Sequence, residues 1–227
     1  MSQLSSALRR LGSAGLRRGL WLPLVLGTMA SVGPCAGPEP KPPDPVPPLR
    51  PADVVKNLQL AYKRRDNVQY TKLLASDFQF WFDPATRPDN VPEFWTRLQD
   101  STGTANLFAA GDVSDIRIDL TFGSDVPTNI VGQERWRRIR VTDTFLEVDK
   151  VPLTGEVITL RVDGDTQDFY VRQGLSPGDT LAGSPTAKQW YLVEWHDLAR
   201  LSALKADGDA PTASEATSWT RIKSIFR

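Results

Sequence analysis

Glu194 and His196, near the end of the chain, could act together as a general acid and base. They lie in Gln189–Asp197, where apolar and polar residues alternate as in a β-strand. Alternation puts Glu194 and His196 on one face together with Trp190 and Leu192. A histidine beside a carboxylate can exchange a proton near neutral pH, so the pair predicts acid–base chemistry if this face lines a pocket. The other interpretation is a half-exposed histidine at a strand end, hydrogen-bonded locally.

Two aspartates extend this candidate set. Asp77 and Asp83 flank the segment Phe78–Phe82. A buried carboxylate at either place would have a raised pKa and could serve as a base. Asp77 could equally accept hydrogen bonds in a turn, and Asp83 precedes Pro84 in a turn-forming pair. The candidate catalytic residues are therefore Glu194, His196 and Asp77.

Other kinds of site find little support. One histidine and one cysteine cannot build a His/Cys site for a transition metal. The sequence contains no glycine-rich phosphate loop and no nucleophile-elbow pattern. We therefore expect neither a metal nor a cofactor.

Cys35, the single cysteine, ends a segment with the features of a secretory leader. Residues 1–35 contain four arginines and no acidic residue, and an apolar run covers Leu20–Leu26. Such a run is too short to span a bilayer, so residues 1–35 are predicted to be a signal peptide. Val32–Cys35 resembles the bacterial lipobox, although Pro34 stands where Gly, Ala or Ser is usual.

The leader predicts lipidation of Cys35 and a protein anchored in the bacterial cell envelope, attached to the membrane through its N-terminal lipid. Two alternatives remain open: a soluble secreted protein cleaved near Ala30 or Gly33, and an organellar presequence.

Residues 36–51 are rich in proline and predict an extended tether. Without the leader, 23 basic and 27 acidic residues remain, a net charge of −4 that argues against nucleic acid as a partner.

Residues 52–200 have the size of one domain. Helical periodicity covers 54–65, 70–78 and 90–98, with Asn90 and Glu93 as a possible capping pair for the third helix. Strand alternation follows at 78–82, 116–122, 136–148, 157–162, 169–173 and 189–197. The alternation in 136–148 slips near Thr142. Asp163–Asp165, between two of these strands, has the composition of a hairpin turn. The predicted fold is α+β, with three N-terminal helices on a strongly curved antiparallel sheet.

This order of elements resembles the NTF2-like (SnoaL-like, cystatin-related) superfamily. The landmarks are the short strand Asp77–Phe80 after the second helix and the final strand Trp190–Asp197. The tail Ser218–Arg227 is similar to that of uncharacterised bacterial lipoproteins carrying this domain. The resemblance implies a cone-shaped fold with a pocket between sheet and helices. It leaves function open, because the superfamily includes isomerases, dehydratases, transport factors and non-enzymatic proteins.

Residues 201–227 are predicted to form a linker and a short amphipathic helix. Trp219, Ile222, Ile225 and Phe226 recur at helical spacing. This helix either packs back on the domain or docks onto a partner or a membrane surface.

The sequence therefore favours a lipid-anchored, non-enzymatic domain that binds a small apolar ligand or a protein partner. The candidate contact residues are Trp81, Trp95, Trp136 and Trp190. The alternative is an isomerase-, dehydratase- or hydrolase-type enzyme that uses acid–base residues in the cone.

Overall fold

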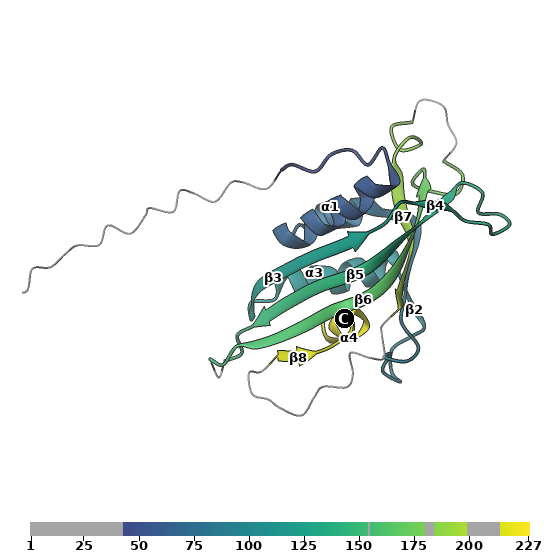
Figure 1. Ribbon diagram of the computed structural model, residues 1–227. Helices are drawn as coiled ribbons and strands as arrows, with labels where there is room; N and C mark the ends of the chain where they lie inside the picture. Colours follow the sequence, from purple (N-terminus) through teal and green to yellow (C-terminus); the bar gives the residue numbers. More distant parts are fainter. Residues whose placement is uncertain (1–42, 154, 180–183, 199–213) are drawn as a thin grey trace, which may run out of the picture. The chain divides into compact units, whose positions relative to one another are not determined.

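The computed structural model describes residues 43–153, 155–179, 184–198 and 214–227 (Figure 1). The chain separates into two compact units, Met1–Lys41 and Pro42–Arg227, and the described residues all belong to the second. Cys35, the expected leader and the first part of the expected tether lie outside them, as does most of the expected linker. Within the described residues, no helix is long and apolar enough to cross a membrane.

The described residues form four helices and one eight-stranded sheet. The helices are α1 (Pro51–Arg64), α2 (Asn67–Leu73), α3 (Arg97–Ala109) and α4 (Trp219–Ile225). The strands are β1 (Leu74–Trp81), β2 (Phe94–Thr96), β3 (Val113–Phe122), β4 (Val126–Pro127), β5 (Trp136–Lys150), β6 (Ile158–Gln173), β7 (Trp190–Leu198) and β8 (Ser214–Ala216). The predicted α+β class is confirmed.

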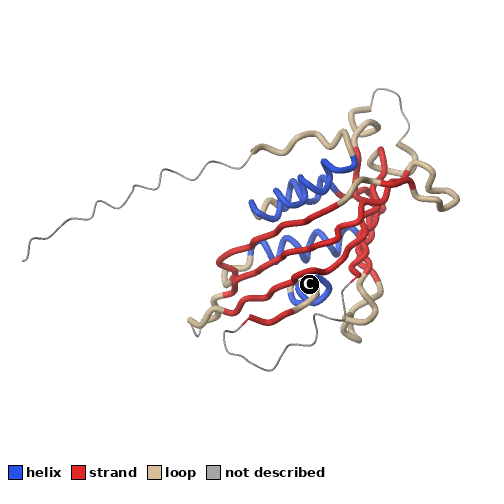
Figure 2. Tube along the Cα trace, viewed as in Figure 1, coloured by secondary structure: helices blue, strands red, loops and turns tan. Residues whose placement is uncertain are grey.

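The sheet is bent, and α1 and α3 lie along one of its faces (Figures 1 and 2). Its strand order is β2-β1-β7-β6-β5-β3, with β4 paired to β5 and β8 paired to β6. On the helix side, α1 buries Val54, Leu58 and Ala61, and β3 buries every second residue from Ile116 to Leu120. The core lies in this space, which is the cone that the resemblance implies.

The prediction of an antiparallel sheet is wrong for two strand pairs, β1 with β7 and β6 with β8. β1 runs parallel to β7, with Phe80 opposite Trp195 and Trp81 opposite His196. β1 continues directly from α2 at Leu74, so the placement of that helix sets its direction. Residue alternation is the same in either direction and cannot distinguish them.

The prediction of three N-terminal helices is also wrong. Only α1 and α2 precede the sheet, and α3 begins at Arg97, after β1 and β2. The capping pair is Thr96 and Gln99: the backbone N–H of Thr96 donates to the Gln99 side chain at 2.9 Å, and Gln99 N–H donates back at 3.5 Å. Asn90 is therefore not the cap, because Phe94–Thr96 pairs as a strand with β1 and buries Trp95.

The predicted hairpin at Asp163–Asp165 is a bulge within one long strand. β6 continues through it, and Thr144 faces Asp165 while Phe145 faces Asp163. Gly164 is the extra residue, and its φ of +74° is the left-handed conformation that glycine adopts readily. A second register shift follows Val141 on β5, so the slip predicted near Thr142 is confirmed. Bulges of this kind let the long strands bend around the core.

Candidate functional site

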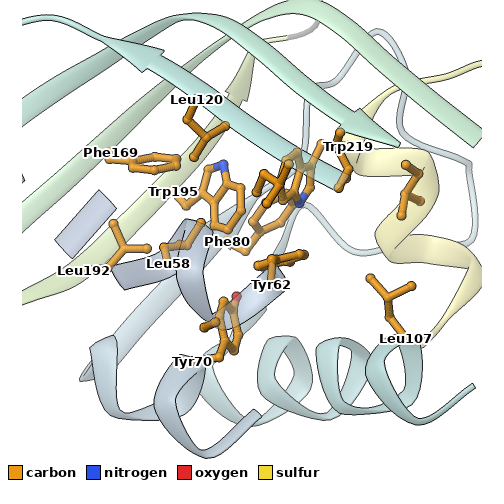
Figure 3. Close-up of a cluster of buried hydrophobic side chains, with 14 of the residues drawn as sticks. Leu58, Tyr62, Tyr70, Phe80, Leu107, Leu120, Phe169, Leu192, Trp195 and Trp219 are labelled. Atoms are coloured by element: carbon orange, nitrogen blue, oxygen red, sulfur yellow. The ribbon is translucent and has the colours of Figure 1, made fainter. Parts of the chain in front are cut away.

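Aromatic side chains fill the cone between the sheet and the helices (Figure 3). The ring of Trp195, on β7, lies 5.2 Å from that of Phe80 and 4.9 Å from that of Phe169, centroid to centroid. Trp219, on α4, lies 4.7 Å from Trp195 and 5.4 Å from Tyr62. All five residues are buried. Tilted and edge-to-face contacts of this type add about 0.5–1.5 kcal/mol per pair beyond simple burial.

The C-terminal helix α4 closes this interior. The Ser218 side chain caps the helix by accepting a hydrogen bond from the backbone N–H of Arg221 at 3.1 Å. Trp219, Ile222 and Phe226 are buried in the core cluster. The prediction that the tail packs back on the domain is therefore confirmed. The docking alternative is wrong for these three side chains, because they face inward.

The close packing of α3 against the Trp95 ring on β2 depends on Gly103. A Cβ atom at this position would lie 2.9 Å from a ring carbon of Trp95 and 3.7 Å from the carbonyl oxygen of Phe226. Asn106, also on α3, holds the end of the chain in place, because its Nδ2 donates a hydrogen bond to the same Phe226 oxygen at 3.0 Å. A larger residue at position 103 would push against the Trp95 ring.

A buried ion pair joins α4 to α3. The Lys223 ammonium contacts a carboxylate oxygen of Asp100, and the two side chains are 4% and 0% exposed. The ammonium also lies 3.1 Å from the Tyr70 hydroxyl and 3.4 Å from the Thr104 hydroxyl. Tyr70 in turn donates to Asp100. Each charge has lost its water, so its stability depends on these partners.

Three aromatic rings surround the same ammonium. Its Nζ lies 4.8 Å from the ring centroid of Phe80, 4.9 Å from that of Trp195 and 5.4 Å from that of Tyr70. Burial lowers the pKa of Lys223, and the charge and hydrogen bond of Asp100 oppose this shift. Burial and the Asp100 charge raise the pKa of Tyr70 well above its ordinary value, so its hydroxyl keeps its proton.

Asp197, on β7, holds the first turn of α4. Its Oδ2 accepts hydrogen bonds from the backbone N–H of Thr220 at 2.8 Å and from the Thr220 hydroxyl at 2.6 Å. Oδ1 is buried and has no hydrogen-bond partner among the described residues. Burial raises the pKa of Asp197 to about 7; the bonds from Thr220 oppose the shift, and the charges of Asp165 and Asp83 add to it. Asp197 therefore titrates near neutral pH.

Among the described residues, a pocket of about 10 Å³ lies in the cone between α3, α4 and Tyr62. A space of this size holds one water molecule at most. With α4 in place, this pocket between the described residues has no room for a substrate or an apolar ligand.

Glu194 and His196 meet as the sequence suggested, but outside the cone. His196 Nε2 and Glu194 Oε2 lie 2.8 Å apart, and both side chains are half-buried. A register shift between Tyr170 and Val171 interrupts the alternation along β7, so Trp195 faces the core instead of Glu194. The condition for acid–base chemistry in the cone, that this strand face turns inward, is therefore not met, and His196 is half-buried with a local hydrogen-bond partner.

Asp77, the third candidate, is engaged elsewhere. Its carboxylate accepts two hydrogen bonds from the guanidinium of Arg172, at 3.0 and 2.9 Å. The same guanidinium lies 5.8 Å from the ring centroid of Trp136. Asp77 thus anchors a polar cluster at the start of β1 and does not join Glu194 and His196 in one site.

The four candidate tryptophans do not converge on one pocket. Trp95 is buried against Phe82, with ring centroids 5.0 Å apart, and Trp190 packs at the edge of the core. Trp81 lies on the outer face beside His196, and Trp136 covers Arg172. These residues serve core packing and two separate surfaces.

The groups that meet in the cone were missed by sequence reasoning. They are Tyr70, Asp100, Thr104, Trp195, Trp219 and Lys223. One signal was present: Lys223 follows Trp219 by one helical turn, so a charge sits on the apolar face of the tail. Nothing in the sequence indicated Asp100 as its partner, because 123 positions separate the two.

No protein-family model matches the sequence, and no curated protein is similar to it. Solved structures are similar to it in fold. A conserved protein from Planctomyces limnophilus has a TM-score of 0.42 at 14% identity, covering 64% of this chain and 89% of its own. An NTF2-like protein of unknown function in nutrient uptake from Rhodospirillum rubrum has a TM-score of 0.39 at 18% identity, covering 66% and 98%. A protein with a cystatin-like fold from Nostoc punctiforme has a TM-score of 0.38 at 12% identity, covering 66% and 89%.

The arrangement of α1, α3 and the bent sheet agrees with the cone-shaped α+β fold that the sequence resemblance implies. Similarity at this level concerns the fold alone. It brings no ligand and no activity to this chain.

The ion pair predicts strong coupling between Asp100 and Lys223. Replacing one partner (Lys223→Met or Asp100→Asn) leaves a buried charge unpaired and should lower the free energy of unfolding by about 3–5 kcal/mol. The double variant should lose clearly less than the sum of the two single losses. Urea unfolding of all four proteins measures this, and additive losses would contradict the coupling.

The raised pKa of Asp197 predicts that its contribution to the free energy of unfolding falls as the pH rises. Its pKa of about 7 in the folded state lies above the ordinary value of 3.8, so folding favours the protonated form. Its contribution is complete below pH 4 and should decline by at most about 1.4 kcal/mol per pH unit up to pH 7. In Asp197→Asn this part of the pH dependence should vanish because an amide does not titrate, while its oxygen can still accept the hydrogen bonds from Thr220. Parallel urea-unfolding profiles of both proteins between pH 5 and 8 would contradict this assignment.

Proposed function

We propose that this chain is a non-catalytic NTF2-like domain of the bacterial cell envelope, anchored through Cys35, which binds a protein partner through its outer surface. The observation that carries the proposal is the filled cone. Trp219 and Lys223 occupy the interior in which a ligand would lie, and about 10 Å³ remains. A domain with this interior must meet its partners on the outside, which favours a protein over a small apolar ligand.

The outer face of the sheet offers a suitable surface. Phe94, Trp81 and His196 lie side by side on β2, β1 and β7, with ring centroids 5.0 and 5.6 Å apart. Tyr170, on β6, extends the row and lies 5.0 Å from His196. All four side chains are half-buried. Aromatic side chains of this kind are enriched in protein interfaces, where they supply contact area together with a polar edge.

An acid–base enzyme is the second candidate, and the 2.8 Å contact between Glu194 and His196 favours it. Such an enzyme would have to work on the outer face, because that is where the pair lies. Trp81 and Tyr170 flank His196 there and would form the walls of the site.

The closed cone predicts that wild-type protein does not respond to apolar ligands, whereas an opened cone does. Trp219→Ala should lose about 3–5 kcal/mol of stability and leave an indole-sized cavity. Indole should then raise the melting temperature of Trp219→Ala and leave the wild type unchanged, because a dry apolar cavity binds ligands of matching shape. Thermal unfolding with and without indole measures both.

Trp136→Ala is the matched control, since it removes a half-buried tryptophan outside the cone. Its melting temperature should not respond to indole. A rise in the melting temperature of the wild type would show that the cone accepts a ligand with α4 in place, and the proposal of a closed cone would fail.

The anchor predicts that Cys35→Ser moves the protein from the membrane fraction to the soluble fraction, because the acylated thiol is lost. Intact mass spectrometry should find the wild type beginning at an acylated Cys35. Pro34→Gly serves as the control and should be acylated at least as completely, since it restores the usual residue before the cysteine. An unmodified wild-type N-terminus near Ala30 or Gly33 would instead support the secreted alternative.

A further inference from the structure

The residues described around the Lys223 ammonium come from other elements than α4, the helix that carries Lys223. Asp100 and Thr104 come from α3, Tyr70 from α2, Phe80 from β1 and Trp195 from β7. The cation comes from a fifth element, α4. The structure therefore separates a cation-binding cage from the group that occupies it.

The chemistry of the cage matches a primary ammonium. The three N–H groups of such a cation can reach the carboxylate of Asp100 and the hydroxyls of Tyr70 and Thr104. Aromatic ring faces attract the same positive charge. The ammonium contacts Asp100 through one oxygen, Oδ1, while Tyr70 donates to the other. A guanidinium prefers to bind both oxygens, so this geometry favours a compact ammonium.

The cage also requires a cation. Asp100 is fully buried, and an isolated carboxylate in this position carries a large desolvation cost. A neutral molecule of the same shape would leave that cost unbalanced. The position of α4 itself depends on further contacts, because Trp219 and Ile222 are buried and Thr220 bonds to Asp197.

We propose that the cone contains a binding site for a primary alkylammonium group and that the chain fills this site with its own Lys223 as an intramolecular ligand. The closed cone is then a self-liganded state. A free amine binds there once the lysine side chain is withdrawn. The ligand class follows from the cage: one positive charge, three N–H donors and a slender alkyl stem.

The test removes the built-in ligand and offers a replacement. Lys223→Ala, made in the full chain, deletes the atoms from Cγ to Nζ, which correspond to n-propylammonium. This amine, added as its chloride at pH 7, should bind and raise the melting temperature of the variant in a saturable manner. At about 100 times its dissociation constant the rise should be about 5–10 °C. Equimolar sodium chloride sets the baseline.

Three controls isolate recognition of the charge. Wild-type protein should not respond, because Lys223 already fills the cage. 1-Propanol has nearly the same shape without the charge and should not stabilise Lys223→Ala. The double variant Asp100→Asn with Lys223→Ala should lose the preference for the amine over the alcohol. Stabilisation of Lys223→Ala by the amine alone supports the proposal, whereas no stabilisation, or equal stabilisation by both compounds, overturns it.

Lys223→Ala could be unfolded without a ligand, because Asp100 is left unpaired. The same compounds are then present during refolding, and circular dichroism measures the recovered structure. Recovery with n-propylammonium but not with 1-propanol supports the site. Failure to recover with the amine, while the double variant folds without it, overturns the proposal.

Discussion

The buried contact between Asp100 and Lys223 is the constraint on which the rest of this domain depends. A carboxylate without access to water needs a cation, and the described structure supplies that cation from the last helix of the chain. When α4 enters the cone, it brings Asp100 this cation. Once α4 is there, its apolar side chains meet the rings of Tyr62 and Trp195. The contact between Lys223 and Asp100 thus helps to fix the position at which α4 packs against the aromatic core.

The packing of α4 into the cone determines where this domain can bind other molecules. In the described structure, side chains of α4 pack into the space between the sheet and the other helices and make it part of the core. The half-buried rings are on the opposite face of the sheet, around His196. Asp197 gives the closure a dependence on pH, since it bonds to the first turn of α4 and titrates near neutrality. The interior is therefore packed for stability, and the surface around His196 is the one that we propose for recognition.

Local patterns predicted most of the elements. Helical stripes indicated α1 and α2, and alternation indicated β3, β5 and β7 close to their observed bounds. Errors arose where two local signals competed. Both Asn90 and Thr96 could cap a helix, and pairing of Phe94–Thr96 with β1 decided for Thr96. Gly164 fits a hairpin turn or a bulge, and only the neighbouring strand distinguishes them.

The sequence by itself determined the α+β class, most of the order of elements and the amphipathic tail, because these depend on the spacing of residues close together in the chain. Only the tertiary structure decided the site. A bulge in the pairing of β6 with β7 turned Glu194 and His196 outward, and folding brought Lys223 to Asp100 from 123 positions away. Strand register and long-range charge pairing depend on contacts between segments that are distant in the sequence. The local periodicity of residues cannot predict such contacts.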